Sequence, residues 1–412
     1  MFERYIQNYF LFLFSVIPIC IIIGPSFSLI NILLIDLSFL FLIFYKRDFS
    51  FIKEKAFIYL LFLYLYLLFN SFISIDPEIG IRRNVGFIRI IILFAAINYF
   101  FNKKSFFNKV FLVWLLIISI VSLDIFIESF SGKNILGYGG EAYGWRIVSF
   151  FKDEPIVGGY FNSFYLILIG FLYEKLGKKH NNKLLLLSII FFVSIFLTGE
   201  RSNTIKAFLG IMFFYVFFRE YPIKKKIILI ISGLIIVVIT ILNTPILKNR
   251  YISQIKASFS ENQKYFNLYK SGYEVFKNNL IFGVGNKNYR IVACSKEFEN
   301  EIKSTHYVCN THPHQIYFEF LSEHGILGSI IILFVFYKLI FEKFLFKFRD
   351  INYIQLGSSI YLMLVFLPLL PSGAFFGDYS ITLFGLNLAI FYSVNSKFNI
   401  FSGYKKENKI EN

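Results

Sequence analysis

The sequence predicts an all-α, polytopic membrane protein, and three observations carry this prediction. Of its 412 residues, 56% are hydrophobic and 17% are charged, whereas an ordinary soluble domain has about a quarter charged residues. The apolar residues form long continuous runs, close to the ~20 residues that one membrane-spanning helix needs. Lysine and arginine gather in alternate loops between these runs, as in membrane proteins of known orientation. A soluble globular domain and a disordered chain are therefore excluded.

Twelve apolar runs predict about twelve membrane-spanning helices in one integral-membrane domain, residues 1–412. In chain order they cover residues 9–23, 27–45, 56–73, 85–101, 107–129, 157–174, 183–198, 204–218, 225–243, 315–341, 352–370 and 376–395. We expect the first run to be a span and not a cleavable signal, because another span follows almost at once without a small-residue cleavage site.

The basic residues predict the orientation of these helices. With the N-terminus in the cytoplasm, every inner segment contains lysine or arginine, whereas the outer loops near 24–28 and 371–380 contain none. An even number of helices puts the tail, residues 396–412, in the cytoplasm as well. Residues 244–314 then form one large outer loop between the ninth and tenth helices. Loops of this length in a compact protein usually carry function.

The net charge of +16 comes from 42 Lys and Arg against 26 Asp and Glu. In a soluble protein such an excess would suggest binding to nucleic acid. Here the basic residues follow the cytoplasmic loops. We therefore expect the bilayer, and no nucleic acid, as the partner of this charge.

Under this topology, informative polar residues from four separate segments fall on the outer side. They are Arg82, Arg83, Arg146, Glu154, Arg201 and the segment Thr311-His312-Pro313-His314. Cations, a carboxylate and histidines converge there on one membrane face. This pattern predicts a site for an anionic, lipid-anchored substrate.

Arg201 and His314 carry the clearest chemistry. The planar fork of an arginine suits phosphate, although Arg201 could also reach lipid headgroups or pair with Glu200. His314 follows a proline and opens the tenth helix. An imidazole titrates near neutrality and can take a proton from a hydroxyl. The alternative for His314 is a capping or packing role.

Three further ionisable residues each have two interpretations. Glu154 lies in a Lys-Asp-Glu-Pro segment, where it could act as a base or form a solvated turn with Lys152. Glu323 and His324 fall inside the tenth helix. Ionisable groups within a membrane are costly and rarely face lipid, so this pair is either functional or a structural contact.

The three cysteines and nearby histidines predict a disulfide and no metal. Cys20 lies in the first apolar run and fits a packing role. Cys294 and Cys309 are fifteen residues apart in the outer loop, and on an oxidising face they can form a disulfide. His306 and His312 flank Cys309, but their spacing matches no familiar zinc pattern.

Several motifs stand in a fixed order through the second half of the chain. They are Gly283-Val-Gly-Asn-Lys-Asn-Tyr-Arg290, Thr311-His-Pro-His-Gln-Ile-Tyr317 and Glu323-His-Gly-Ile-Leu-Gly328, together with Arg201-Ser202, the segment from Arg146 to Gly159, and Pro371-Ser-Gly-Ala-Phe-Phe376. This ordered set, over roughly residues 140–390, resembles the O-antigen ligase and O-antigen polymerase superfamily of bacterial inner membranes. Gln315 departs from the usual Asn after the histidine, and Lys270 stands where many members carry an arginine.

The resemblance implies a GT-C-like fold and a metal-independent membrane glycosyltransferase without a cofactor. The donor would be an oligosaccharide linked to undecaprenyl diphosphate, used on the periplasmic side of the inner membrane. Arg201 would hold the diphosphate and His314 would act as the base, with Glu154 as the reserve base. The expected substrate-binding residues are Arg82, Arg146, Lys270, Arg290 and His312.

The acceptor stays open between two activities. A ligase transfers the glycan to lipid A–core sugar, and a polymerase transfers it to another lipid-linked repeat. The segments Arg146–Gly159 and Pro371–Phe376 resemble the polymerase branch more closely. The alternative class is a transporter or a flippase of lipid-linked glycan. The single long outer loop, the lack of paired halves and the cations at one face favour an enzyme.

Overall fold

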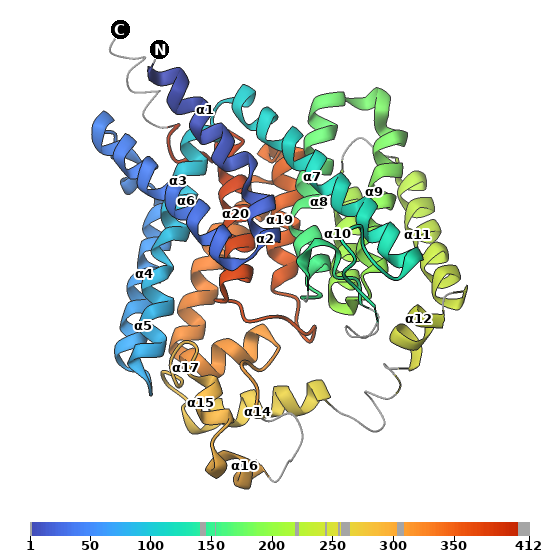
Figure 1. Cartoon of the computed structure of the whole chain (residues 1–412). Helices are drawn as coiled ribbons and strands as arrows, with labels where there is room; N and C mark the ends of the chain where they lie inside the picture. The colour runs from blue at the N-terminus through green and yellow to red at the C-terminus, as the bar shows by residue number, and fades with distance from the viewer. Residues whose placement is uncertain are drawn as a thin grey trace.

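The computed structural model describes residues 2–140, 146–152, 154–218, 222–243, 245–253, 256, 264–302 and 309–402. These residues form helices and turns, and no β-strand occurs among them (Figure 1). The prediction of an all-α protein is confirmed for this part of the chain.

Helices form at each of the twelve predicted apolar runs. Those of the first half are α1 (Phe2–Ser15), α2 (Ile17–Ile23), α3 (Pro25–Lys46), α4 (Lys55–Phe72), α5 (Pro77–Gly86), α6 (Ile88–Phe101), α7 (Lys104–Ser131) and α8 (Val157–Leu176). Those of the second half are α9 (Asn181–Leu197), α10 (Arg201–Phe217), α11 (Ile223–Asn243), α12 (Pro245–Lys248), α14 (Lys264–Asn278), α15 (Tyr289–Ala293), α16 (Lys296–Ile302), α17 (Ile316–Phe336), α18 (Glu342–Lys347), α19 (Tyr353–Val365) and α20 (Asp378–Ser393).

Five segments among the described residues are long and apolar enough to cross a membrane. They are α3, α4, the run of α5 and α6, α7, and the run from α17 to Asp350. A sixth candidate is the pair α1 and α2, which is bent by 42°. The protein is therefore a helical membrane protein, and the full number of twelve spans stays a prediction.

The helix α8 is buried along nearly its whole length and packs on α19. The two helices approach closely at Gly170 and Gly357. A Cβ atom on Gly170 would meet the backbone of Tyr353, and one on Gly357 would meet the backbone of Leu166. Small residues permit such close approach between helices in a membrane.

Polar contacts define the two ends of the helix bundle. At one end the Lys46 Nζ atom lies 3.4 Å from a carboxylate oxygen of Glu3, and the Asn399 side chain donates to the carbonyl oxygen of Asn98 at 2.7 Å. The N-terminus, the turns after α3 and α6, and the segment after α20 thus share this end. The helices α14, α15 and α16 lie at the opposite end (Figure 1). The predicted topology likewise expects the helices of the outer loop to lie opposite the N-terminus, and the side of the membrane on which each end lies stays a prediction.

The helix α17 breaks at Gly325, which has a φ of 64°. The segment that precedes α15 docks at this break through its backbone. The N–H groups of Val284 and Gly285 donate to the carbonyl oxygens of Ser322 and Glu323, each at 2.9 Å. Backbone groups at membrane depth need such partners when a helix is interrupted. Two of the motifs in the sequence are therefore in direct contact, and their joint presence has a structural cause.

Candidate active site

Three arginines from separate segments lie together, and we call them the arginine group. Arg201 is the first residue of α10, Arg146 lies in the segment before α8, and Arg250 follows α12. The Nε and Nη2 atoms of Arg250 donate to the carbonyl oxygen of Gly199 at 3.1 and 3.0 Å. Burial lowers the pKa of Arg250, and the nearby charges of Arg146 and Arg201 lower it further. The three guanidinium groups are therefore close enough for their charges to affect one another.

Arg146 and Arg201 make no ion pair with any residue that the structure describes. The carboxylate of Glu200 instead accepts hydrogen bonds from the Gly158 N–H at 2.6 Å and from the Asn203 side chain at 2.7 Å. Burial raises the pKa of Glu200 to about 7, although these two donors and the charge of Arg146 lower it. Glu200 thus connects the start of α10 with the start of α8 through a hydrogen bond. Arg146 and Arg201, which form no ion pair, can bind an anionic ligand.

Two carboxylates of α7 hold the segment that carries Arg146. Glu128 accepts from the N–H groups of Val148 and Ser149 at 3.0 and 2.6 Å. Asp124 accepts from the Ser149 hydroxyl at 2.5 Å. Both carboxylates are buried, and buried charges of this kind need hydrogen-bond partners. Their role is to position the backbone beside the arginine group.

The rings of His312 and His314 lie with their centroids 4.0 Å apart and their planes inclined by 42°. The His312 Nε2 atom lies 3.3 Å from the carbonyl oxygen of Ser372. Burial lowers the pKa of His312 to about 4, and the adjacent His314 ring and the charge of Arg290 add to this shift. His312 is therefore neutral at pH 7, and two imidazoles with different surroundings lie side by side.

His314 does not begin the tenth helix as the sequence predicts. It has a φ of 55°, in the left-handed region, and α17 begins two residues later at Ile316. Gln315 caps this helix, because its side-chain oxygen accepts from the N–H groups of Tyr317 and Phe318 at 2.8 and 3.0 Å. The residue that departs from the family pattern is thus the N-cap of this helix.

Tyr265, on α14, connects the histidines with the arginine group. The centroids of the Tyr265 and His314 rings are 6.5 Å apart. Tyr265 is also close enough to Arg250 to raise the pKa of that guanidinium. Tyr265 therefore neighbours both His314, in the segment before α17, and Arg250, in the segment after α12.

Arg290 lies near the histidines, whereas two other predicted cations lie on the surface. The charge of Arg290 is felt at His312. Arg82 and Lys270 are exposed on α5 and α14 and form no ion pair with a residue that the structure describes. Arg83, one position after Arg82, points inward, and its Nη1 atom lies 3.0 Å from a carboxylate oxygen of Asp378.

Glu154 lines a cavity of about 170 Å³ whose lining includes neither His312 nor His314. The cavity is bounded by α2, α3 and the start of α20, and its polar lining includes Lys152, Arg89 and Asp378. The Tyr379 hydroxyl, also at this cavity, donates to the carbonyl oxygen of Ile156 at 3.0 Å. Glu154 is therefore an exposed residue on the wall of this cavity.

The ionisable pair within α17 makes structural contacts. A carboxylate oxygen of Glu323 lies 3.4 Å from the N–H of Tyr289, which donates to it. The His324 Nδ1 atom lies 3.3 Å from the Tyr66 hydroxyl, and its ring lies against Phe376 with the centroids 5.4 Å apart. These contacts connect the broken helix with its neighbours.

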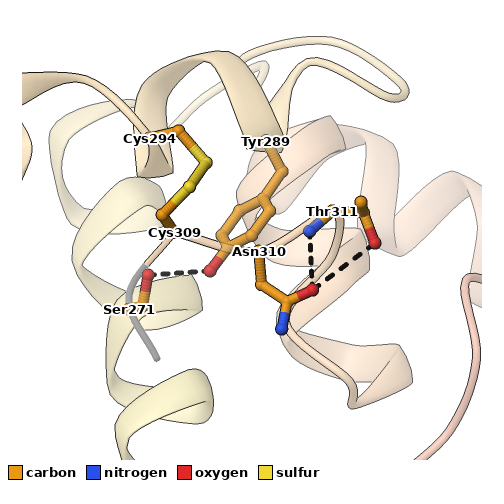
Figure 2. The surroundings of a disulfide bond; sticks show 6 residues. All are labelled: Ser271, Tyr289, Cys294, Cys309, Asn310 and Thr311. Carbon is orange, nitrogen blue, oxygen red and sulfur yellow. Dashed lines mark hydrogen bonds between the residues drawn. A yellow bond between two sulfur atoms is a disulfide. The ribbon is translucent and has the colours of Figure 1, made fainter. Parts of the chain in front are cut away.

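Cys294 and Cys309 form a disulfide, with their Cα atoms 4.3 Å apart. Figure 2 shows that this bond joins the end of α15 to the segment that continues toward His312. Beside it the hydroxyl groups of Tyr289 and Ser271 are 2.7 Å apart and hydrogen-bonded. The disulfide therefore attaches the histidine segment to the helices α14 and α15.

Sequence reasoning did not identify Arg250, Tyr265 or Lys287. Arg250 and Tyr265 stand alone in the polar segment 244–314, so no spacing distinguishes them. His306, near the cysteines, lies outside the described residues. Within the residues described, no three His, Cys, Asp or Glu side chains gather as metal ligands.

Comparison with known proteins identifies one domain. No curated protein matches the chain significantly. Residues 186–333 match the family model described as O-antigen ligase. This match includes Arg201, Arg250 and both histidines, but neither Arg146 nor Glu154. Over residues 186–333 the chain is therefore similar to the O-antigen ligase family, in agreement with the resemblance of the ordered motifs in the sequence.

Proposed function

We propose that this protein is a surface-polysaccharide glycosyltransferase of the bacterial inner membrane. It transfers glycan from undecaprenyl diphosphate to an acceptor hydroxyl at the periplasmic face, and needs no metal. The observation that carries this proposal is the proximity of His314 to the arginine group through Tyr265. This arrangement lies mostly within the O-antigen ligase domain.

The arginine group would bind the diphosphate of the donor. Arg146 and Arg201 are cations without an ion pair among the described residues, and a guanidinium can hold phosphate oxygens in a bidentate geometry. Negative charge grows on the diphosphate as its bond to the sugar breaks. Fixed cations stabilise this charge, which lowers the barrier to transfer.

His314 would act as the general base. A ring nitrogen of His314 takes the proton of the acceptor hydroxyl, and the acceptor oxygen forms a bond to the anomeric carbon of the donor. The bond between that carbon and the diphosphate oxygen breaks, and undecaprenyl diphosphate leaves with the bonding electron pair. His312 favours this step because a neutral neighbour opposes protonation of His314 less than a charged one.

The acceptor is a sugar hydroxyl, either of another lipid-linked repeat or of lipid A–core. We propose the polymerase activity, from the resemblance of Arg146–Gly159 and Pro371–Phe376 to that branch. Residues 244–314 are then periplasmic and both termini cytoplasmic. The single domain with a large outer loop would orient two large substrates at the membrane surface.

The experiment is in vitro transfer by the purified protein in lipid nanodiscs. The donor is a defined oligosaccharide on undecaprenyl diphosphate, and the acceptor is either a second such molecule or lipid A–core. We expect a longer lipid-linked glycan, with the same rate in a chelator. Movement of intact lipid-linked glycan across vesicle membranes, without any new glycosidic bond, would instead establish a flippase.

A further inference from the structure

A second group of cations lies near the histidines, and we call it the second cationic group. Its members are Arg83 of α5, Arg89 of α6, and Lys287 and Arg290 at the start of α15. Asp378 is shared by two of them, because one carboxylate oxygen lies 3.0 Å from Arg83 Nη1 and 2.6 Å from Arg89 Nη2. Lys287 and Arg290 make no ion pair with a residue that the structure describes. The group therefore contains four positively charged side chains, and Asp378 is the one carboxylate that pairs with any of them among the described residues.

The backbone around Lys287 is fixed from both sides. The N–H of Asn286 donates to the side chain of Asn70 at 2.8 Å, and the side chain of Asn288 accepts from the N–H of Asp76 at 2.7 Å. Lys287 lies between these two asparagines with a φ of 65°. A non-glycine residue in this region usually has a functional or strong structural reason. The contacts hold Lys287 against the ends of α4 and α5.

Two nitrogen atoms of this group, Arg89 Nε and Arg290 Nε, are buried and have no hydrogen-bond partner within the described residues. Buried donors of charged groups nearly always make a hydrogen bond in folded proteins, because a buried donor without an acceptor costs free energy. Burial and the charges of Arg83 and Arg290 also lower the pKa of Lys287. These features are those of a site that binds an anion.

The cavity described above adjoins this group. Arg89 and Asp378 belong to its lining. Its opposite wall is apolar and comes from α2 and α3, with Ile21, Leu29 and Ile32 among its residues. The neighbouring Ile30 side chain is 56% exposed, as expected on a lipid-facing helix. The cavity thus connects cationic residues with an apolar surface at the edge of the bundle.

We propose that the second cationic group binds a phosphate or diphosphate of the acceptor, and that the lipid chain of the acceptor lies in the adjoining cavity. This inference rests on the proposed function, in which the arginine group holds the donor diphosphate. Two separate cationic groups then flank the histidines, one for each substrate. The phosphate could belong to a second lipid-linked repeat or to a phosphorylated core sugar. The apolar wall favours the lipid-linked repeat.

The main test measures the KM for acceptor and donor in the transfer reaction. Three acceptors carry the same glycan: one on polyprenyl diphosphate, one phosphorylated without a lipid, and one on a neutral alkyl chain. We expect Lys287→Gln and Arg290→Gln to raise the KM for the two phosphorylated acceptors by about 10-fold or more, which corresponds to one charged hydrogen bond. The KM for the neutral acceptor and for the donor should not change.

Two variants serve as comparisons. Lys277→Gln removes an exposed cation of α14 and should change no KM. Leu29→Trp narrows the cavity at a residue that is 39% exposed, and should raise the KM only for lipid-linked acceptors. If Lys287→Gln and Arg290→Gln raise the donor KM as much as the acceptor KM, or affect all three acceptors equally, the inference is wrong.

A binding measurement separates this inference from the proposed function. Titration with farnesyl diphosphate should show two sites in the wild type. Arg201→Gln should remove one site, and Lys287→Gln should weaken the other. A single site, with normal transfer activity, would overturn the inference and leave the proposed function intact. Lack of transfer by the wild type would reject the function itself. If Arg290→Gln fails to fold, Lys287→Gln still decides, because its side chain makes no ion pair with a described residue.

Discussion

The backbone N–H of Ser372 donates to the carbonyl oxygen of His314 at 2.8 Å. The carbonyl oxygen of the same serine lies 3.3 Å from His312 Nε2. Three residues further on, the Phe375 N–H donates to the buried carboxylate of Glu319 at 2.8 Å. The loop between α19 and α20 is therefore bonded both to the segment before α17, at His314, and to α17 itself, at Glu319. It positions both histidines, although it contributes no titratable side chain to them.

Replacement of Arg201 by lysine should abolish most transfer activity. Arg201→Lys keeps the positive charge, but an ammonium group cannot reproduce the bidentate geometry of a guanidinium. We expect turnover to fall by at least about 10-fold, which corresponds to the loss of one charge-assisted hydrogen bond. Initial rates with a saturating acceptor measure this loss.

Lys270→Ala is the control, because it removes an exposed cation on α14. Its turnover should match the wild type, and both variants should elute from size-exclusion columns as the wild type does. Normal turnover of Arg201→Lys would mean that only a point charge is needed at this position.

Gly325→Ala should destabilise the protein strongly. Gly325 has a φ of 64°, and a Cβ atom there would collide with the backbone at Ile281. The cost combines a left-handed conformation with displacement of the docked segment, and we expect more than about 2 kcal/mol. Thermal unfolding in detergent measures the difference.

Gly132→Ala separates these two contributions. Gly132 also has a positive φ, 77°, but nothing lies within 4 Å of its added Cβ. This variant should lose only about 1 kcal/mol, the cost of the conformation itself. If both variants lose the same stability, the contact between α17 and the docked segment contributes little.

The sequence predicted the helices and the cysteine pair because each follows from a local signal. Apolar runs reveal helices, and two cysteines in one outer loop can pair. The motifs around Gly283 and Gly325 were recognised only as family signatures. Their contact joins two backbone segments that are about forty residues apart in the sequence. No local pattern predicts such a contact.

The candidate site was harder to predict from the sequence because side-chain direction decides it. Arg82 and Arg83 are adjacent, and about 100° around the helix axis separates an exposed residue from an inward one. Arg250 follows no motif, and its role depends on its contact with Gly199. Such contacts arise from tertiary packing and leave no spacing in the sequence.

Removal of the disulfide should destabilise the outer segment and lower activity. The double variant Cys294→Ser, Cys309→Ser opens a loop of fifteen residues, for which the chain-entropy model gives about 3 kcal/mol. We expect faster proteolysis of the segment 264–314 and a several-fold lower turnover, because the disulfide holds the segment before His312. Cys20→Ser should change neither property. Equal proteolysis of the double variant and the wild type would contradict this expectation.

Glu200 should make the protein less stable as the pH rises from about 4.5 to 7. The pKa of this carboxyl is about 7 in the folded protein, above its usual value of 4.5. In this window the folded state binds more protons than the unfolded state, so the free energy of unfolding decreases with pH. One group contributes at most about 1.4 kcal/mol per pH unit.

Glu200→Gln isolates this contribution, since glutamine does not titrate. The difference in Tm between the variant and the wild type should change between pH 5 and 7 and stay constant above pH 8. A difference that is constant over the whole range would mean that Glu200 keeps an ordinary pKa.

His314 is the residue on which the proposed chemistry depends most. A sugar hydroxyl is a poor nucleophile until its proton is removed, and the base must lie beside the acceptor while the diphosphate occupies the arginine group. The two histidine rings are 4.0 Å apart, but their surroundings differ. His312 is buried, faces the Ser372 carbonyl oxygen and has a pKa of about 4. His314 is the ring that faces Tyr265.

We therefore expect His314→Ala to lower turnover by about 10²–10⁴-fold, the usual contribution of a general base, with donor binding unchanged. His312→Ala should have a smaller effect, because it removes a contact with the α19–α20 loop and not the base. Glu154→Gln should retain most activity, since Glu154 is exposed and lines a cavity that contains neither histidine. Turnover and donor binding of the three single variants decide between them. If turnover is lost only in Glu154→Gln, and His314→Ala instead loses donor binding, Glu154 is the base and His314 belongs to the diphosphate site.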